Sequence, residues 1–233
     1  MHDEPATSDW LPLDPEDHAA QLAAVFLLAQ GPPRASRILD IGAGTGRVAR
    51  PLAQRGHQVV ALDNNDAAME HLAGENLTPV LGDALSPALD LAALGPFDGA
   101  LCLGHTFMLF HDVAQASGLL RRVRAAMNPS GGGWFAIDNF AEQVWRDIAD
   151  GDWQTGLSED DQWQFIWSGN DNTAVIRHGA EVRPDDWDIG PADRLLRLWT
   201  PGELALLAAS AGFGPPRVDH TGALLVFPCA APA

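Results

Sequence analysis

Short apolar runs alternate with helical patterns from about residue 14 to residue 139 of this 233-residue chain. Strands that helices cover on both faces read as near-continuous apolar segments, and parallel strands need crossover helices between them. The alternation therefore predicts a doubly wound α/β fold. We expect a single Rossmann-like domain over residues 1–233, built on a mostly parallel seven-stranded sheet, with a small antiparallel subdomain inserted in it.

The expected elements follow one another along the chain. Strands are expected at residues 37–41, 58–63, 78–81, 99–104, 134–138, 217–220 and 224–227. Helices are expected at residues 18–30 (capped by Asp14 or Asp17 and ended by the Gly31-Pro32-Pro33 segment), 47–55, 67–73 (capped by Asn65), 87–94 and 113–127, and from Thr200 to Gly212. The caps rest on side chains that accept hydrogen bonds from free N–H groups at the start of a helix.

Charge and composition exclude several classes of function. The 31 acidic and 14 basic residues give a net charge of -17, which would repel a nucleic acid from most of the surface. No stretch approaches the roughly 20 apolar residues of a membrane helix. The acidic N-terminus lacks the pattern of a signal peptide, so we expect a cytoplasmic protein. The two cysteines, Cys102 and Cys229, show no metal-ligand spacing and form no disulfide framework.

The segment ILDIGAGTGRVA places three glycines, Gly42, Gly44 and Gly46, between a strand and a helix. Glycines at such a turn let bare backbone approach a ligand. Asp63 ends the next strand, where a carboxylate can accept hydrogen bonds from a ribose diol. Arg47 stands where the dinucleotide fingerprint has its third glycine, and no Gly-Lys-Ser/Thr follows, so a pyrophosphate or a Walker loop is not supported. The pattern predicts a nucleoside ligand.

The motif Asp40-Ile41-Gly42-Ala43-Gly44-Thr45-Gly46 resembles the first motif of class I S-adenosylmethionine-dependent methyltransferases. The resemblance leaves out only the N-terminal tip and the middle of the insert. It continues through ALDNNDAAMEHL, LGDAL, GALCLG, NPSGGGWFAIDN and RLWTPGELALLAASAGF. It implies S-adenosylmethionine as the cofactor and methyl transfer as the reaction.

The resemblance also implies roles for particular residues. The methionine half of the cofactor would lie against Asp40, Gly42, Ala43, Gly44 and Gly46. The ribose would lie at Asp63 and Asn64, the adenine at Asp83 and Ala84, and the sulfonium between Leu103, Gly104 and His105.

His105 is the expected catalytic residue, either orienting the acceptor or deprotonating it, and the alternative is that it only packs. The stretch LCLGHTFMLFHD is similar to that of glycine and sarcosine N-methyltransferases, which have Asn at the place of His105. Those enzymes also carry an Arg soon after strand five, where this chain has Asn139, Phe140 and Ala141. This difference argues against glycine as the acceptor.

Asp138 and Asn139 are similar to a pair in metal-dependent catechol-type O-methyltransferases. Their third ligand, an Asp past strand four, is replaced by Gly104-His105, and hard cations prefer oxygen ligands, so we expect no metal. The Asn-Pro-Pro-aromatic motif of DNA amino-methyltransferases and a Pro-Cys nucleophile are missing after strand four, in agreement with the charge.

Residues 141–200 hold six of the eight tryptophans and predict the insert after strand five. Two or three antiparallel strands are expected in QWQFIW, NTAVIRHGAEV and RLLRLW, which alternate with a period near two. The insert would either pack a small sheet onto the domain or a second subunit, or form a lid that excludes water and shapes the acceptor pocket.

We therefore expect methyl transfer to the N or O of a small molecule by a monomer or homodimer. The alternative is an S-adenosylmethionine-binding sensor or partner subunit without turnover.

Overall fold

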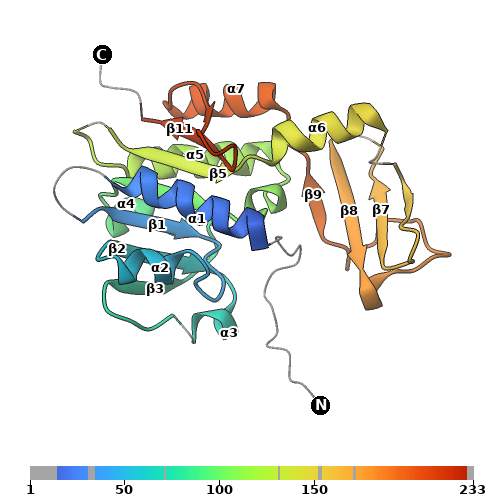
Figure 1. The fold of residues 1–233 in the computed structure, drawn as a ribbon, viewed down its shortest axis with the longest axis horizontal. Helices are drawn as coiled ribbons and strands as arrows, with labels where there is room; N and C mark the ends of the chain where they lie inside the picture. The colour runs from blue at the N-terminus through green and yellow to red at the C-terminus, as the bar shows by residue number, and fades with distance from the viewer. Residues whose placement is uncertain are drawn as a thin grey trace.

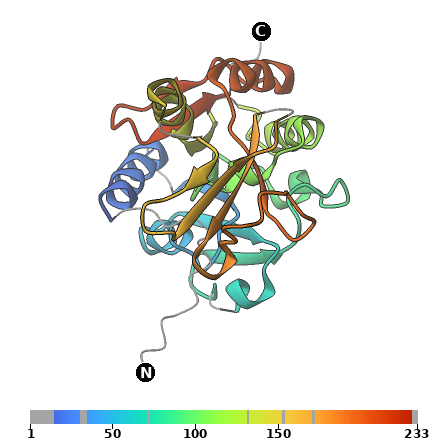
Figure 2. The same ribbon diagram turned by 90° about the vertical axis from the view of Figure 1, so that its right-hand side faces the viewer.

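The computed structural model describes residues 15–30, 35–70, 72–130, 132–151, 154–169 and 172–229, with the side chains of residues 140–144 left out. Two sheets make up the fold, one of seven strands and one of four (Figure 1). Figures 1 and 2 place the four-stranded sheet beyond one end of the seven-stranded sheet. The helix–sheet layers predicted from the alternation are therefore confirmed, and the insert stands apart from them.

The seven-stranded sheet has the order β10-β11-β5-β4-β1-β2-β3. Its strands are β1 Arg37–Ile41, β2 Gln58–Asp63, β3 Leu77–Leu81, β4 Gly99–Cys102, β5 Trp134–Asp138, β10 Arg217–Val218 and β11 Leu224–Pro228. The first five strands run parallel, while β11 is antiparallel to both β5 and β10. Since β2 and β4 lie on opposite sides of β1, the strand order reverses at β1, where α/β sheets bind their ligands.

Helices cover both faces of this sheet. The first face carries α1 Pro15–Ala29, α2 Ala49–Gln54 and α3 Asp66–Met69, and the second carries α4 Leu91–Leu94, α5 Val113–Ala125 and α7 Pro201–Ala211. Adjacent strand residues alternate between the two cores: Ile38 belongs to the first, and Leu39 and Ile41 to the second. Because successive strand side chains point to opposite faces, the apolar runs of the sequence fill two cores at once.

Several helix ends lie where the sequence places them. The Asn65 side chain accepts a hydrogen bond from the Ala68 N–H, and Thr200 forms a capping box with Glu203. Gly212 ends α7 at a φ of +81°. The helices α2, α3 and α4 are shorter than expected, and Asp17 lies in the first turn of α1 rather than capping it. The other proposed cap and the Gly31-Pro32-Pro33 stop lie outside the described residues.

One helix contradicts the expected bounds of the insert. Residues 141–150 were expected in the irregular subdomain, but α6 Phe140–Asp150 follows β5 directly and ends at Gly151, where φ is +92°. Trp145 and Ile148 pack against the core of the main sheet, and the Trp145 indole N–H donates to the Trp199 carbonyl at 3.1 Å. In the sequence, Trp145 groups this segment with the tryptophan-containing strands that follow, so the helix is not predicted.

The insert is a four-stranded antiparallel sheet of β6 Gly156–Leu157, β7 Trp163–Trp167, β8 Thr173–His178 and β9 Leu195–Arg197, in that order. The three strands predicted from the alternation are confirmed, and β6 is an additional short edge strand. Trp199, fully buried, ties the end of the insert to the main domain because its indole N–H donates to the Phe107 carbonyl at 3.2 Å. Short 3₁₀ helices, η1 Thr106–Leu109 and η2 Gly179–Glu181, complete the described elements.

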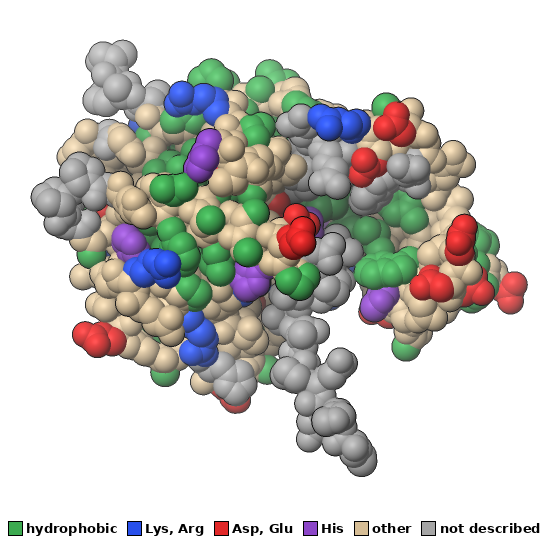
Figure 3. Space-filling model, viewed as in Figure 1, with side chains coloured by type: hydrophobic (Ala, Val, Ile, Leu, Met, Phe, Trp, Pro, Cys, Tyr) green, Lys and Arg blue, Asp and Glu red, His purple; other side chains and the backbone are tan. Residues whose placement is uncertain are grey.

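Figure 3 shows Asp and Glu side chains on the outer part of the insert and a hollow between the insert and the main body. In the part of the chain that the structure describes, no helix has the length and apolar character needed to cross a membrane.

Candidate functional site

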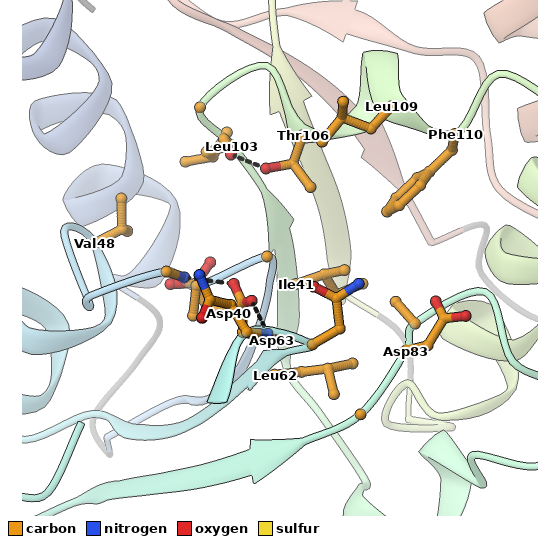
Figure 4. Close-up of a pocket in the computed structure, with 18 of the residues that line it drawn as sticks. Asp40, Ile41, Val48, Leu62, Asp63, Asp83, Leu103, Thr106, Leu109 and Phe110 are labelled. Atoms are coloured by element: carbon orange, nitrogen blue, oxygen red, sulfur yellow. Dashed lines mark hydrogen bonds between the residues drawn. The ribbon is translucent and has the colours of Figure 1, made fainter. Parts of the chain in front are cut away.

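A cavity of about 510 Å³ opens at the carboxyl ends of β1, β2, β3 and β4 (Figure 4). Its wall comes from the loops after these four strands, from η1 and from one residue of the insert. The lining residues are Asp40, Ile41, Gly42, Ala43, Gly44, Thr45, Arg47, Val48, Leu62, Asp63, Asn64, Asn65, Gly82, Asp83, Ala84, Leu85, Leu103, Gly104, Thr106, Leu109, Phe110 and Arg194. Its position matches the strand-order reversal, and its volume suits a small molecule of nucleoside size or larger.

The glycine loop after β1 holds a backbone that other residues could not adopt. Gly42 has a φ of +71°, and a Cβ atom there would lie 2.5 Å from the Thr106 side chain. The Gly44 N–H donates to Asp63 Oδ2 at 2.7 Å, and the Asn65 N–H donates to Asp63 Oδ1 at 2.8 Å (Figure 4). Asp63 therefore fixes the loop and the turn after β2 together, with its carboxylate on the cavity wall.

Asp40 lies at the bottom of this site and is 3% exposed. Burial raises the pKa of Asp40 to about 7, because a carboxylate away from water is disfavoured in its charged form. The Arg47 guanidinium works against this rise, and the negative charge of Asp63 adds to it. The carboxyl therefore changes charge near neutral pH.

The loop after β4 is held by Asp138, a buried residue at the end of β5. Asp138 accepts hydrogen bonds from the Gly104 N–H at 3.1 Å and from the His105 N–H at 2.9 Å. It also accepts one from the side-chain amide of Gln21 on α1. His105 has a left-handed backbone, with φ of +60°, and these bonds keep it there. Thr106 completes the turn by donating to the Leu103 carbonyl at 2.8 Å (Figure 4).

The structure brings together all but two of the residues that the resemblance assigns to the cofactor. One exception is His105. The other is Gly46, where a Cβ would lie 2.5 Å from Leu72, so this glycine allows close packing rather than lining the cavity. The cavity is lined by the predicted residues Asp40, Gly42, Ala43, Gly44, Asp63, Asn64, Asp83, Ala84, Leu103 and Gly104. Their roles toward a ligand stay predictions.

His105 lies in the loop between two lining residues, Gly104 and Thr106, but is not itself among the residues of the cavity wall. It is half-buried. A place beside the cavity suits contact with a methyl acceptor, if the cavity itself holds the cofactor. The catalytic role of His105 stays a prediction.

The lining residues that were not predicted as part of the site include Arg47, Leu109, Phe110 and Arg194. The sequence drew attention to Arg47 only as a departure from the dinucleotide fingerprint. Arg194 lies in the insert, directly after Asp193, and no spacing in the sequence connects it to the glycine loop. Only the folding of the insert over the strand ends brings it to the cavity.

The Asp138-Asn139 pair is engaged in the structure. The Asp138 carboxylate holds the loop after β4 and α1, and the Asn139 side chain donates to the Gly222 carbonyl at 2.8 Å. Among the described residues no group of three or more His, Cys, Asp or Glu could hold a metal ion.

Comparison with known proteins agrees with this geometry. Residues 38–131 match the family described as "Methyltransferase domain", a segment that runs from β1 to just before β5 and holds most of the cavity wall. The matched segment is therefore the part of the chain that forms β1 to β4 and most of the cavity wall.

Solved structures extend the likeness to nearly the whole chain. The CcbJ methyltransferase from Streptomyces caelestis is 22% identical with a TM-score of 0.66, covering 96% of this chain and 94% of that one. An amino pentose methyltransferase from Micromonospora echinaspora, solved with S-adenosylmethionine bound, is 18% identical with a TM-score of 0.57, covering 99% and 100%. The 1,6-didemethyltoxoflavin-N1-methyltransferase of Burkholderia thailandensis is 23% identical with a TM-score of 0.55, covering 92% and 80%. These likenesses show a Rossmann-like methyltransferase fold.

Proposed function

We propose that this chain is an S-adenosylmethionine-dependent methyltransferase that acts on a nitrogen or oxygen atom of a small molecule. The observation that carries the proposal is the cavity at the strand-order reversal, whose wall is the glycine loop and the strand-end aspartates of the matched methyltransferase domain. The structures of similar fold include an amino pentose methyltransferase and one solved with 1,6-didemethyltoxoflavin, which supports a small acceptor here.

The residues of the cavity fit this cofactor. Each oxygen of the Asp63 carboxylate accepts one backbone hydrogen bond and keeps a further lone pair for a ribose hydroxyl. Asp83 and Ala84 lie just after β3, where the adenine would bind, and the apolar side chain of Phe110 offers it a surface. Asp40 lies beside the glycine loop. The amino group of the cofactor would provide a positive counter-charge for its buried carboxylate there.

When bound, S-adenosylmethionine supplies an electrophilic methyl group on a sulfonium sulfur. The chain's part is alignment, because holding two reactants in line contributes on the order of 7 to 11 kcal/mol without a dedicated base. Asp138 does this for the loop after β4 by fixing the backbone of Gly104 and His105. We assign His105 the role of orienting the acceptor, from its place beside the cavity.

The insert, predicted over residues 141–200, would serve as the lid. Arg194 reaches the cavity wall from it, which supports a role of the insert in covering the opening and in shaping the surface that an acceptor would meet. The chain has no Arg directly after β5 that could grip a carboxylate as in glycine methyltransferases, so the acceptor is a small molecule other than glycine.

Ligand binding tests the proposal. S-Adenosylhomocysteine at about 100 times its dissociation constant should stabilise the fold by roughly 2.7 kcal/mol, while NAD should leave it unchanged. Asp63→Ala should weaken S-adenosylhomocysteine tenfold or more, about 1.4 kcal/mol, in calorimetry. Stabilisation by NAD but not by S-adenosylhomocysteine would contradict the proposal. Binding without transfer of labelled methyl to any compound of a metabolite pool would show a sensor or partner subunit instead.

His105→Ala should lower turnover roughly 100-fold while leaving S-adenosylhomocysteine affinity unchanged. If His105 orients the acceptor, the pH profiles of wild type and variant should have the same shape. A loss of stability of about 1 to 3 kcal/mol with normal turnover per folded molecule would show that the residue only packs. Melting temperature, affinity and single-turnover rate on one preparation separate these outcomes.

A further inference from the structure

The four-stranded insert leaves its aromatic side partly exposed and buries its other side. Along β7, Trp163, Phe165 and Trp167 are half-buried, whereas Gln164 and Ile166 between them are buried. Because successive side chains of a strand point to opposite faces, the three aromatic residues share one face of the sheet, called here the aromatic face. A sheet with one solvated side ordinarily turns its polar residues outward, so the partial exposure of the aromatic face needs a reason.

The opposite face of the insert is covered by the loop from β8 to β9. The Gln164 side-chain amide donates to the Arg183 and Asp186 carbonyls at 2.9 and 3.0 Å. Arg177, which pairs with Gln164 across the strands, donates to the Asp188 carbonyl at 2.7 Å. The polar groups of this face therefore have partners within the insert, and the aromatic face is the side that a ligand can reach.

One row of the aromatic face leads to the cavity. Gly156 lies opposite Phe165, and Phe165 lies opposite Ile176. Continuing the register of β8 and β9 by one residue places Ile176 beside Arg194. Residues directly opposite each other in antiparallel strands have their side chains on the same face. Since Arg194 lines the cavity, the aromatic face is turned toward the cavity.

The last strand of the insert meets the main domain at η1. The Trp199 indole N–H donates to the Phe107 carbonyl at 3.2 Å, and Arg197 Nη1 donates to the His111 carbonyl at 3.4 Å. The helix η1 begins directly after His105 and contributes to the cavity wall. In Figure 3, hydrophobic side chains are visible inside the hollow between the insert and the main body. A molecule in this hollow would meet the insert on one side and the loop after β4 on the other.

The space over this row is open at its far end. Gly156 places no side chain beside Phe165, and a Cβ atom there would meet only the Gln154 carbonyl oxygen, at 3.9 Å, among the described residues. Neighbouring strands lie about 4.8 Å apart, so Phe165 lies two strand spacings, roughly 10 Å, from Arg194 at the cavity. This length suits a molecule of two fused rings.

The chemistry of the aromatic face suits a flat apolar ring better than a sugar. His178 stacks on Trp163 with ring centroids 4.0 Å apart, and Phe165 meets Trp167 edge to face at 5.1 Å. The other side chains of the face, from the register, are those of Ala174, Ile176 and Leu196. The hydroxyl groups of a sugar would find few hydrogen-bond partners there, and burying them unpaired is unfavourable. An aromatic ring would gain offset or edge contacts with these rings.

From these contacts we infer that the methyl acceptor carries a flat aromatic ring system that binds against the aromatic face of the insert, with its nucleophilic atom toward the cavity beside His105. The inference rests on the proposed function, since it names the class of small molecule that the same site takes. It gives the tryptophans of β7 a role in selecting the acceptor.

Three amines that differ in their rings test it. These probes are 2-naphthylmethylamine, its saturated counterpart decahydro-2-naphthylmethylamine, and glucosamine. Ligand-detected NMR titrations measure their binding to the protein saturated with S-adenosylhomocysteine. Wild type should bind the flat amine roughly two- to tenfold more tightly than the saturated one, because aromatic contacts contribute beyond their buried area. Glucosamine should bind most weakly.

Two variants of the aromatic face and one matched control locate the site. Trp163→Ala should weaken the flat amine to the affinity of the saturated one. Gly156→Leu fills the space beside Phe165 and should weaken the flat amine by about tenfold or more. The control is Trp187→Ala, whose side chain is 40% exposed in the loop that covers the opposite face, and it should bind all three amines as wild type does. All three variants should keep the S-adenosylhomocysteine affinity of wild type.

In wild type, equal affinities for the flat and saturated amines, no binding of the flat amine, or tighter binding of glucosamine would each overturn the inference. An unchanged preference in Gly156→Leu would overturn it too, and this variant decides if Trp163→Ala does not fold. A methylated product without an aromatic ring, found in a metabolite pool with labelled S-adenosylmethionine, would overturn the inference and leave the proposed function standing. Failure of wild type to bind S-adenosylhomocysteine would instead overturn the proposed function.

Discussion

The cavity end of the seven-stranded sheet and the four-stranded insert each hold one aspartate that is shielded from solvent. The pKa of the first is raised and the pKa of the second is lowered. Asp40 is 3% exposed and its pKa is raised to about 7 by burial. The side chain of Asp193 is also 3% exposed, yet its pKa is lowered to about 2. Asp40 lies deep in the main domain, whereas Asp193 lies near the surface of the insert. The depth of burial and the partners of each carboxylate therefore decide together.

Asp193 is paired in the folded chain. Arg177 donates to it twice, from Nε at 2.8 Å and Nη2 at 2.7 Å, and Gly190 N–H and Arg183 add two further hydrogen bonds. These bonds to the charged form outweigh desolvation. Among the described residues, the attraction of Arg47 and a hydrogen bond from the Ala49 backbone favour the charged form of Asp40, and they do not offset burial.

Under the proposed function, the difference separates a structural carboxylate from one that would meet a ligand. In the insert, the Arg177–Asp193 pair holds the loop from β8 to β9 and so the position of the next residue, Arg194, at the cavity. In the main domain, burial of the Asp40 carboxylate without a matching counter-charge costs stability, and in the proposed function the amino group of the cofactor would supply that charge. The seven-stranded sheet is held by two apolar cores, one on each face, and not by a buried ion pair of this kind among the described residues.

The largest effect should follow from breaking the pair in the insert. Arg177 is 1% exposed, so Arg177→Ala leaves Asp193 buried without its main counter-charge and should destabilise the insert by about 3 to 5 kcal/mol. Hydrogen exchange of peptides from β7 and β8 should speed up, while peptides from β1 and β4 stay protected. Uniform exchange across both sheets would show that the insert does not open as a separate unit.

The next effect is in the pH dependence of stability of the main domain. Between the unfolded pKa of 3.8 and the folded pKa of about 7, folded Asp40 keeps a proton that the unfolded chain has lost. Stability from this group therefore falls as pH rises through that window and stays constant above it.

Asp40→Asn removes the titratable carboxyl and, with it, this pH dependence of stability. The variant should gain about 2 to 3 kcal/mol relative to wild type between pH 5 and pH 8, measured by urea unfolding without ligand. Parallel pH curves for the two proteins would contradict a raised pKa.

The smallest effect should come from Arg183→Ala. Arg183 contacts Asp193 at 3.1 Å but its side chain is 45% exposed, so solvent screens the pair and the loss should be about 0 to 1 kcal/mol. This variant is the matched control for Arg177→Ala, because both touch the same carboxylate. A loss as large as that of Arg177→Ala would show that contact, rather than burial, sets the strength of the pair.

Local chemistry in the sequence determined the main sheet and the part of the cavity wall formed by the glycine loop and the strand-end aspartates. Apolar runs of strand length, the glycines of the loop after β1 and the capping box at Thr200 each depend on residues a few positions apart. Asp63 could be placed because parallel strands end at one edge of a sheet, and the residue after each strand then faces the same crevice.

Tertiary structure alone decided the features that need distant residues to meet. Gln21, Arg47 and Asp138 lie far apart in the chain, and only the packing of α1 beside the strand ends joins them. Arg194 reaches the cavity only because Trp199 and α6 fix the insert over it. The pKa of Asp40 is likewise absent from the sequence, since it depends on burial and on the distances between charges, and both are set when the chain folds.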